Sequence, residues 1–125
     1  MILIYGGAYQ GKLDYAFGHY GKNCSVYQCT EKEAAPDLSK DIINSFHWLV
    51  LAQLRNEKDP LGDVEKNLEK MRSKIIICDD ISCGIVPIDA EMRQWRESVG
   101  GVLRFLAKHS EEVIRLFCGI GTRIK

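Results

Sequence analysis

Short apolar runs separated by polar segments predict four strands in this chain. The clearest runs lie at residues 1–5, 74–78 and 113–118, and a weaker one lies at residues 24–28. Three consecutive isoleucines within residues 74–78 are typical of a central parallel strand that is covered on both faces.

Between these runs, apolar residues recur every three or four positions, which predicts helices. The expected helices span about residues 11–21, 41–54, 61–72 and 89–106. Ile42 and Ile43 fit the apolar pattern of the second helix, and Asp89 is the expected cap of the fourth. Gly100 and Gly101 each cost that fourth helix about 1 kcal/mol, so we expect a close packing contact there. Strands that alternate with helices indicate an α/β fold with a mainly parallel sheet.

Composition fits a single domain covering residues 1–125, with 46% hydrophobic and 27% charged residues. The 17 basic residues balance 17 acidic ones, which argues against a broad surface for nucleic acid. No apolar run approaches the roughly 20 residues that span a bilayer, and the first residues do not resemble a signal peptide. We therefore expect a cytoplasmic protein with no membrane span, whose five cysteines are reduced.

The stretch after the first strand has the spacing of a phosphate-binding loop, in which glycine and four further residues precede Gly-Lys. Glycines let backbone N–H groups point toward a phosphate, and the next helix adds partial positive charge at its N-terminus. Lys12 could then reach the outer phosphates. The alternative is a tight turn with an incidental lysine. The candidate nucleotide-binding residues are Gly6, Gly7, Ala8, Tyr9, Gln10, Gly11, Lys12 and Leu13.

Leu13 departs from this motif, because the residue after the lysine is normally a serine or threonine whose hydroxyl holds Mg²⁺. A leucine side chain offers no oxygen to a metal ion. Phosphate binding tolerates this change better than phosphoryl transfer does, since transfer depends on positioned metal charge.

Two acidic residues, Asp79 and Asp80, follow the predicted strand at residues 74–78. Open α/β sheets bind their ligands at the carboxyl ends of strands, so either carboxylate could hold Mg²⁺ directly or through water. The alternative is that one of them caps the following turn.

Other charged and titratable residues carry a weaker signal. Arg93 and Arg96 are three positions apart and share a helix face, where they either bind phosphate or are solvated. His19, His47 and His109 have no partner that the sequence reveals, and we expect packed or surface histidines.

These stretches together resemble the bifunctional adenosylcobinamide kinase and adenosylcobinamide-phosphate guanylyltransferase family of cobalamin biosynthesis. The family's opening Gly-Gly-Ala-Arg-Ser-Gly-Lys-Ser is similar to residues 6–13. Its later Asn-Glu-Val-Gly-x-Gly-Ile-Val-Pro is similar to residues 79–87, and the Arg-x-x-Arg-Asp that follows is similar to residues 93–97. Its final Ser-Gly-Ile-x-x-x-Ile/Leu-Lys is similar to residues 118–125.

The resemblance is clearest over about residues 1–17 and 75–125, and it implies a P-loop NTPase-like three-layer fold. It also implies phosphoryl transfer from ATP or GTP, with Mg²⁺, to a hydroxyl of a corrinoid. Lys12 and Asp80 would be the catalytic residues, with Asp80 in place of the family's glutamate.

The chain also departs from this family. Family members are longer, and their extra segment carries the histidine that becomes guanylylated. Only about residues 29–41 fill that interval here, without a histidine. The guanylyltransferase half of the activity is therefore less expected than the kinase half.

Three functions remain open from the sequence. The first is a shortened kinase of this kind, and the second is a nucleotide- or corrinoid-binding relative without turnover. The third is a structural α/β domain with an empty loop. A homo-oligomer is compatible with so small a sheet, and the sequence does not distinguish ATP from GTP.

Overall fold

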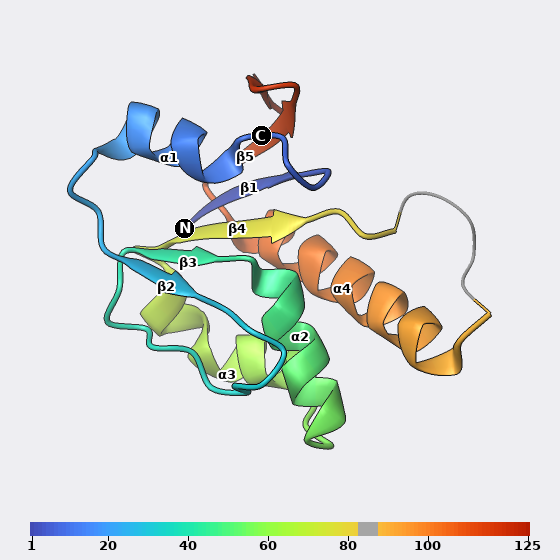
Figure 1. Cartoon of the computed structure of the whole chain (residues 1–125). Coiled ribbons are helices and arrows are strands. Elements are labelled where there is room, and N and C mark those ends of the chain that lie inside the picture. Colours follow the sequence, from blue (N-terminus) through green and yellow to red (C-terminus); the bar gives the residue numbers. More distant parts are fainter. Residues whose placement is uncertain (83–87) are drawn as a thin grey trace.

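The computed structural model describes residues 1–82 and 88–125, which form six strands and four helices (Figure 1). The strands are β1 (Ile2–Gly6), β2 (Val26–Gln28), β3 (Ile42–Asn44), β4 (Ile75–Asp79), β5 (Glu112–Phe117) and β6 (Ile120–Arg123). The helices are α1 (Lys12–Tyr20), α2 (Phe46–Arg55), α3 (Pro60–Met71) and α4 (Ala90–His109). The sheet order is β2-β3-β4-β1-β5-β6, parallel except for the β5–β6 pair. The expected α/β fold with a mainly parallel sheet is confirmed.

Helices cover both faces of the sheet, so the domain has three layers (Figure 1). Successive strand residues point to opposite faces, and Leu3 and Ile4 of β1 therefore belong to different clusters of buried side chains. Leu3 packs on the side of α2, α3 and α4, whereas Ile4 packs on the side of α1. Burial on both faces explains the unbroken isoleucine run of β4.

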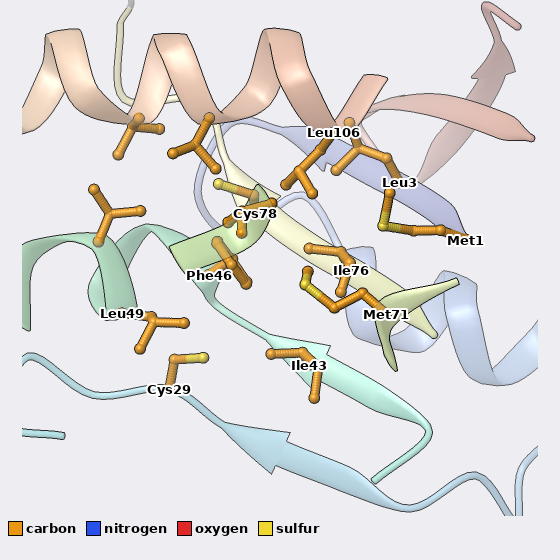
Figure 2. Close-up of a cluster of buried hydrophobic side chains, with 14 of the residues drawn as sticks. Met1, Leu3, Cys29, Ile43, Phe46, Leu49, Met71, Ile76, Cys78 and Leu106 are labelled. Atoms are coloured by element: carbon orange, nitrogen blue, oxygen red, sulfur yellow. The ribbon is translucent and has the colours of Figure 1, made fainter. Parts of the chain in front are cut away.

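The larger core lies between the sheet and α2, α3 and α4. Figure 2 shows side chains from β1, β3 and β4 pointing toward α2 and α4. Leu3, Ile43, Leu49, Ile76 and Leu106 are each at most 1% exposed. Truncating such a residue to alanine costs about 2–5 kcal/mol. This core therefore holds β1, β3 and β4 in place, and the candidate site lies at their carboxyl ends.

One predicted boundary is wrong: residues 42–44 form strand β3, and the second helix begins only at Phe46. Ile42 and Ile43 are β-branched and fully buried, one on each face of the sheet, between β2 and β4. Ser45 then adopts a left-handed backbone with φ of 59°, which ends the strand before the helix starts.

The C-terminal segment is also more regular than expected. Residues Ile120–Arg123 form β6, which pairs with β5 in antiparallel orientation. Cys118 and Gly119, between the two strands, both have positive φ, at 51° and 77°. Tight hairpin turns with positive φ at both central residues match the twist of paired strands, so this short segment can fold back on β5.

The remaining predictions have different outcomes. Asp89 caps α4 as predicted, since its side chain accepts a hydrogen bond from the Glu91 amide at 2.8 Å. The close contact expected at Gly100 and Gly101 is wrong for the described residues. Apart from the helix's own backbone, no described atom lies within 4 Å of a Cβ at Gly100, and a Cβ at Gly101 would meet only the Arg104 guanidinium of the same helix, at 3.9 Å. Residues 83–87, which include the Gly-Ile-Val-Pro stretch, lie outside the described residues. No helix in residues 1–82 and 88–125 has the length and hydropathy to cross a bilayer.

Candidate functional site

Two glycines at the loop that joins β1 to α1, Gly6 and Gly11, occupy positions that favour glycine. A Cβ at Gly6 would lie 2.3 Å from the carbonyl oxygen of Leu116, so only glycine fits beside β5. Tyr9 and Gly11 both have left-handed φ, at 59° and 84°. Tyr9 is fully exposed at the tip of the loop, and its strained backbone is unusual for a non-glycine residue.

The loop is fastened to the turn between β5 and β6 through Gln10. The side-chain oxygen of Gln10 accepts a hydrogen bond from the Cys118 amide, and its backbone carbonyl accepts one from the Gly119 amide at 3.1 Å. The turn of the C-terminal hairpin therefore holds the loop in place, a role that the sequence did not indicate.

Lys12 is the best-defined charged group of the loop. Its side chain is only 7% exposed, and its ammonium donates to the Gly7 carbonyl oxygen at 2.6 Å. The same ammonium lies 2.6 Å from Oδ1 of Asp79. Asp79 is opposite Gly6 in the β1–β4 register, so strand pairing delivers its carboxylate to the loop.

Asp79 is also held by His47, at the start of α2. The Asp79 amide donates to Nδ1 of His47 at 3.1 Å, which leaves the ring hydrogen of the neutral imidazole on Nε2. Nε2 lies 3.5 Å from Oδ2 of Asp79. Burial lowers the pKa of His47, so the neutral ring is favoured. Trp95 fixes the backbone here by donating from Nε1 to the His47 carbonyl oxygen at 2.7 Å.

His47 was expected to be a packed or surface histidine, and it is indeed 4% exposed. Its position beside Asp79 was missed. The usable signal was its place three residues after Asn44, where β3 ends next to β4. That signal was hidden because residues 42–44 were assigned to a helix.

A cleft of about 470 Å³ opens between the loop and the ends of β3 and β4. Its two sides are the loop wall, residues 8–14, and the opposite wall, made of residues from β3, α2 and β4. The opposite wall comprises Asn44, Ser45, His47, Trp48 and Asp79. The cleft therefore brings residues 8–13 of the predicted loop and Asp79 together with residues that were not predicted, whereas Gly6 and Gly7 do not line it.

Asp80 has different surroundings from Asp79. Its backbone amide donates to the Gly6 carbonyl oxygen at 2.8 Å. Its carboxylate accepts hydrogen bonds from Ser82, from the amide at 3.0 Å and from the hydroxyl. Asp80 thus organises the turn after β4, the second of the two roles that the sequence left open for this acidic pair.

The described residues do not by themselves form a metal centre, since no group of three metal-binding side chains occurs among them. Leu13 packs with the core under α1 and supplies no oxygen. Among the described residues, Asp79 and Asp14 are the carboxylates that line the cleft. Mg²⁺ is commonly held by one or two carboxylates together with substrate phosphates and water, and this donor set fits that arrangement.

Arg93 and Arg96 lie away from this cleft, on α4. They line a separate hollow of about 610 Å³ together with Ser82, Glu97, Gly100 and Arg104. Arg96 donates to the Ser82 carbonyl oxygen, and Arg93 donates to that of Ile88. The two arginines therefore do share a helix face, as predicted.

Comparison with protein-family models finds no match to this chain, and comparison with curated proteins finds none either.

Proposed function

We propose that the cleft binds the phosphates of ATP or GTP in the manner of a P-loop NTPase. The observation that carries the proposal is Lys12, whose nearly buried ammonium bridges the loop carbonyl of Gly7 and the carboxylate of Asp79. A phosphate in the cleft would meet this ammonium, the loop amides and the N-terminus of α1. All three favour a negatively charged ligand.

The ammonium of Lys12 would exchange partners when phosphate binds. Without phosphate it neutralises Asp79, which is 22% exposed and faces the cleft. With phosphate it would turn to the β and γ oxygens, as the lysine of such loops does. Mg²⁺ would arrive with the nucleotide, and Asp79, or Asp80 one residue further along the chain, would hold it directly or through water.

We further propose that the chain transfers the terminal phosphoryl group to a hydroxyl of a corrinoid. The hydroxyl oxygen of the acceptor forms a bond to the γ-phosphorus, and the bond between the γ-phosphorus and the oxygen that bridges it to the β-phosphorus breaks. The electron pair of the broken bond stays on the nucleoside diphosphate, and the hydroxyl proton passes to water. Positioning and charge stabilisation supply most of such catalysis, which Lys12 would provide. The corrinoid rests on the family resemblance alone.

Leu13 favours a second candidate, a relative that binds nucleotide or corrinoid without turnover. The side chain that normally completes the metal site is here part of the core under α1. Binding through the loop amides and Lys12 would persist, while the rate of transfer would fall.

Calorimetry tests the nucleotide binding that both candidates share. ATP, GTP and inorganic tripolyphosphate are titrated with and without Mg²⁺ into the wild type, Lys12→Met and Lys22→Met. Lys22 is an exposed lysine just beyond α1 and serves as the matched control. Binding that Lys12→Met strongly weakens and Lys22→Met does not change supports the site, and no binding to the wild type at millimolar concentration contradicts it. Incubation with adenosylcobinamide and labelled nucleotide then tests turnover.

A further inference from the structure

The hairpin formed by β5 and β6 has one covered side and one exposed side. On the side of α1, Leu116 is 1% exposed, and a Cβ at Gly121 would lie 2.5 Å from the ring of Tyr15. On the other side, Phe117 and Ile120 are 67% and 71% exposed. Helix α1 therefore covers one side of the hairpin, whereas the other side presents large apolar residues to solvent.

Strand alternation shows which residues share the exposed side. Val113 belongs to the core of α2, α3 and α4, so Arg115 and Phe117 point to that same side of the sheet. Phe117 pairs with Ile120 in the β5–β6 register, which places Ile120 there too. Ile124, which is 56% exposed, lines a hollow together with Val113. We call this side the open face, and its residues are Arg115, Phe117, Ile120, Thr122 and Ile124.

A groove runs along α4 beside the open face. A hollow of about 230 Å³ is lined by Leu103 and Ala107 of α4 and by Val113 and Ile124. The hollow of about 610 Å³ on α4 adjoins it, because Arg104 lines both. We call the two hollows together the α4 groove. Since Ile124 belongs to the groove and to the open face, one partner could cover both.

Gly100 lies in the α4 groove, and the described chain gives it no close contact. Glycine in a helix interior is destabilising relative to alanine, so a glycine at this position needs a compensating reason. The distance between two packed helices depends on the side chains at their contact. A helix from outside the described chain could approach α4 closely at Gly100.

The charges along this surface are mainly positive. Arg93, Arg96 and Arg104 line the α4 groove, and Glu97 is the one acidic residue among its described lining. Arg115 adds another guanidinium on the open face. Within the described part of the chain, no salt bridge involves Arg104 or Arg115. Complementary charges favour the correct partner, so the surface favours an acidic one.

We propose that the α4 groove and the open face dock an amphipathic helix of a partner protein, with an apolar face and with Asp or Glu along its edges. Parallel sheets are normally covered by helices on both faces, and such a helix would complete the cover over β5 and β6. Apolar side chains recurring every three or four positions would pack on Phe117, Ile120 and Ile124. The acidic edges would meet Arg104 and Arg115. This docking does not depend on nucleotide binding.

Two other modes of association fit this surface less well. A partner strand could add to the edge of β6, but β6 has only four residues and includes Gly121 and Arg123, features that oppose edge pairing. A second copy of this chain could dock through the same face. Its two-fold axis would bring the same patch together on both copies, and hence Arg115 toward Arg115.

Fluorescence anisotropy with two labelled peptides tests the proposal. Both probes are capped helices of about 18 residues, with leucine at every third or fourth position. One carries glutamate on both sides of the leucine stripe, and the other carries lysine there. Each is titrated with the wild type, Phe117→Ser, Arg115→Glu and Leu61→Ser. Leu61 on α3 is an exposed apolar residue that lines neither hollow, so it is the matched control.

We expect the wild type to bind the glutamate peptide at least about tenfold more tightly than the lysine peptide. Phe117→Ser should weaken binding of the glutamate peptide by about tenfold, because an apolar contact is lost. Arg115→Glu should reduce the ratio of the two affinities by about tenfold, because it reverses one charge of the surface. Leu61→Ser should bind both peptides as the wild type does.

Three results would overturn the proposal: the wild type binds neither peptide at millimolar concentration, it binds both equally, or Phe117→Ser binds the glutamate peptide unchanged. Two further measurements identify a different occupant. A dimer in sedimentation equilibrium that Phe117→Ser dissociates would assign the open face to a second copy. Flotation with phosphatidylserine vesicles that Phe117→Ser abolishes would assign it to a membrane surface. Either result would contradict docking of a partner helix.

Discussion

The two walls of the cleft are constructed in different ways. The loop wall comes from consecutive residues of the β1–α1 loop and the first turn of α1, and its glycine, its lysine and its shape are local properties. The opposite wall is assembled by the sheet, which brings His47 to Asp79 across 32 positions of sequence. On the proposed function, a phosphate would bind mainly to the loop wall, and the opposite wall would supply the Asp79 carboxylate that competes for Lys12.

Lys12 joins the two walls, and its loss should have the largest effect. We expect Lys12→Met to weaken tripolyphosphate and nucleotide binding by about 100-fold. Charged hydrogen bonds contribute roughly 1.5–3 kcal/mol each, and the lysine would make at least one to phosphate. Calorimetry measures the change, and Lys22→Met should bind as the wild type does. Equal affinities for Lys12→Met and the wild type would mean that phosphate does not bind at this loop.

Loss of the Asp79 carboxylate should have the opposite effect on the affinity for phosphate. In the absence of Mg²⁺, we expect Asp79→Asn to bind tripolyphosphate about tenfold more tightly, because the carboxylate both repels phosphate and competes for Lys12. Asp80→Asn is the matched control, since the neighbouring carboxylate accepts hydrogen bonds from Ser82. These two variants separate the opposite wall from its surroundings, because Asp79 lines the cleft and the adjacent Asp80 does not. Weaker binding by Asp79→Asn would show that the carboxylate does not oppose phosphate.

His47 should make the free energy of unfolding depend on pH. Because burial holds its pKa below the value of about 6.5 in an unfolded chain, the unfolded state binds more protons below that pH. The free energy of unfolding should therefore fall as the pH drops from 7.5 toward 5.5. His47→Asn should flatten this slope, because asparagine does not titrate in this range, and should cost about 1 kcal/mol at pH 7.5 through the lost packing of the buried ring.

Urea unfolding at several pH values measures both effects. His19→Asn is the control, since His19 is an exposed histidine on α1. A slope that His47→Asn leaves unchanged would assign the pH dependence to other groups.

The difference between the two walls also explains which features the sequence could predict. The strands of the central sheet and the loop at residues 6–13 follow from short-range patterns, because a buried strand needs apolar residues and a tight turn needs glycine. Residues 42–44 could not be assigned in this way. Ile42 and Ile43 fit a helix as well as a strand, and only pairing with β2 and β4 decides between them.

That one ambiguity also hid most of the opposite wall. Once β3 is a strand, Asn44 lies at its carboxyl end beside β4, and His47 follows within one turn of α2. The choice between Asp79 and Asp80 is similar, because strand register sets which carboxylate faces Lys12. Sequence spacing alone does not contain that register.

Leu13 gives the smallest expected effect and the most direct test of the loop wall. Leu13→Ser restores the hydroxyl that normally helps to hold Mg²⁺ and removes a partly buried side chain from the core under α1. Leu13→Ala removes the same packing without adding an oxygen. We expect only the serine variant to increase the gain in nucleotide affinity on adding Mg²⁺, by about threefold, since a partly solvated hydroxyl replaces one water ligand. If both variants respond to Mg²⁺ as the wild type does, the missing hydroxyl does not limit metal–nucleotide binding.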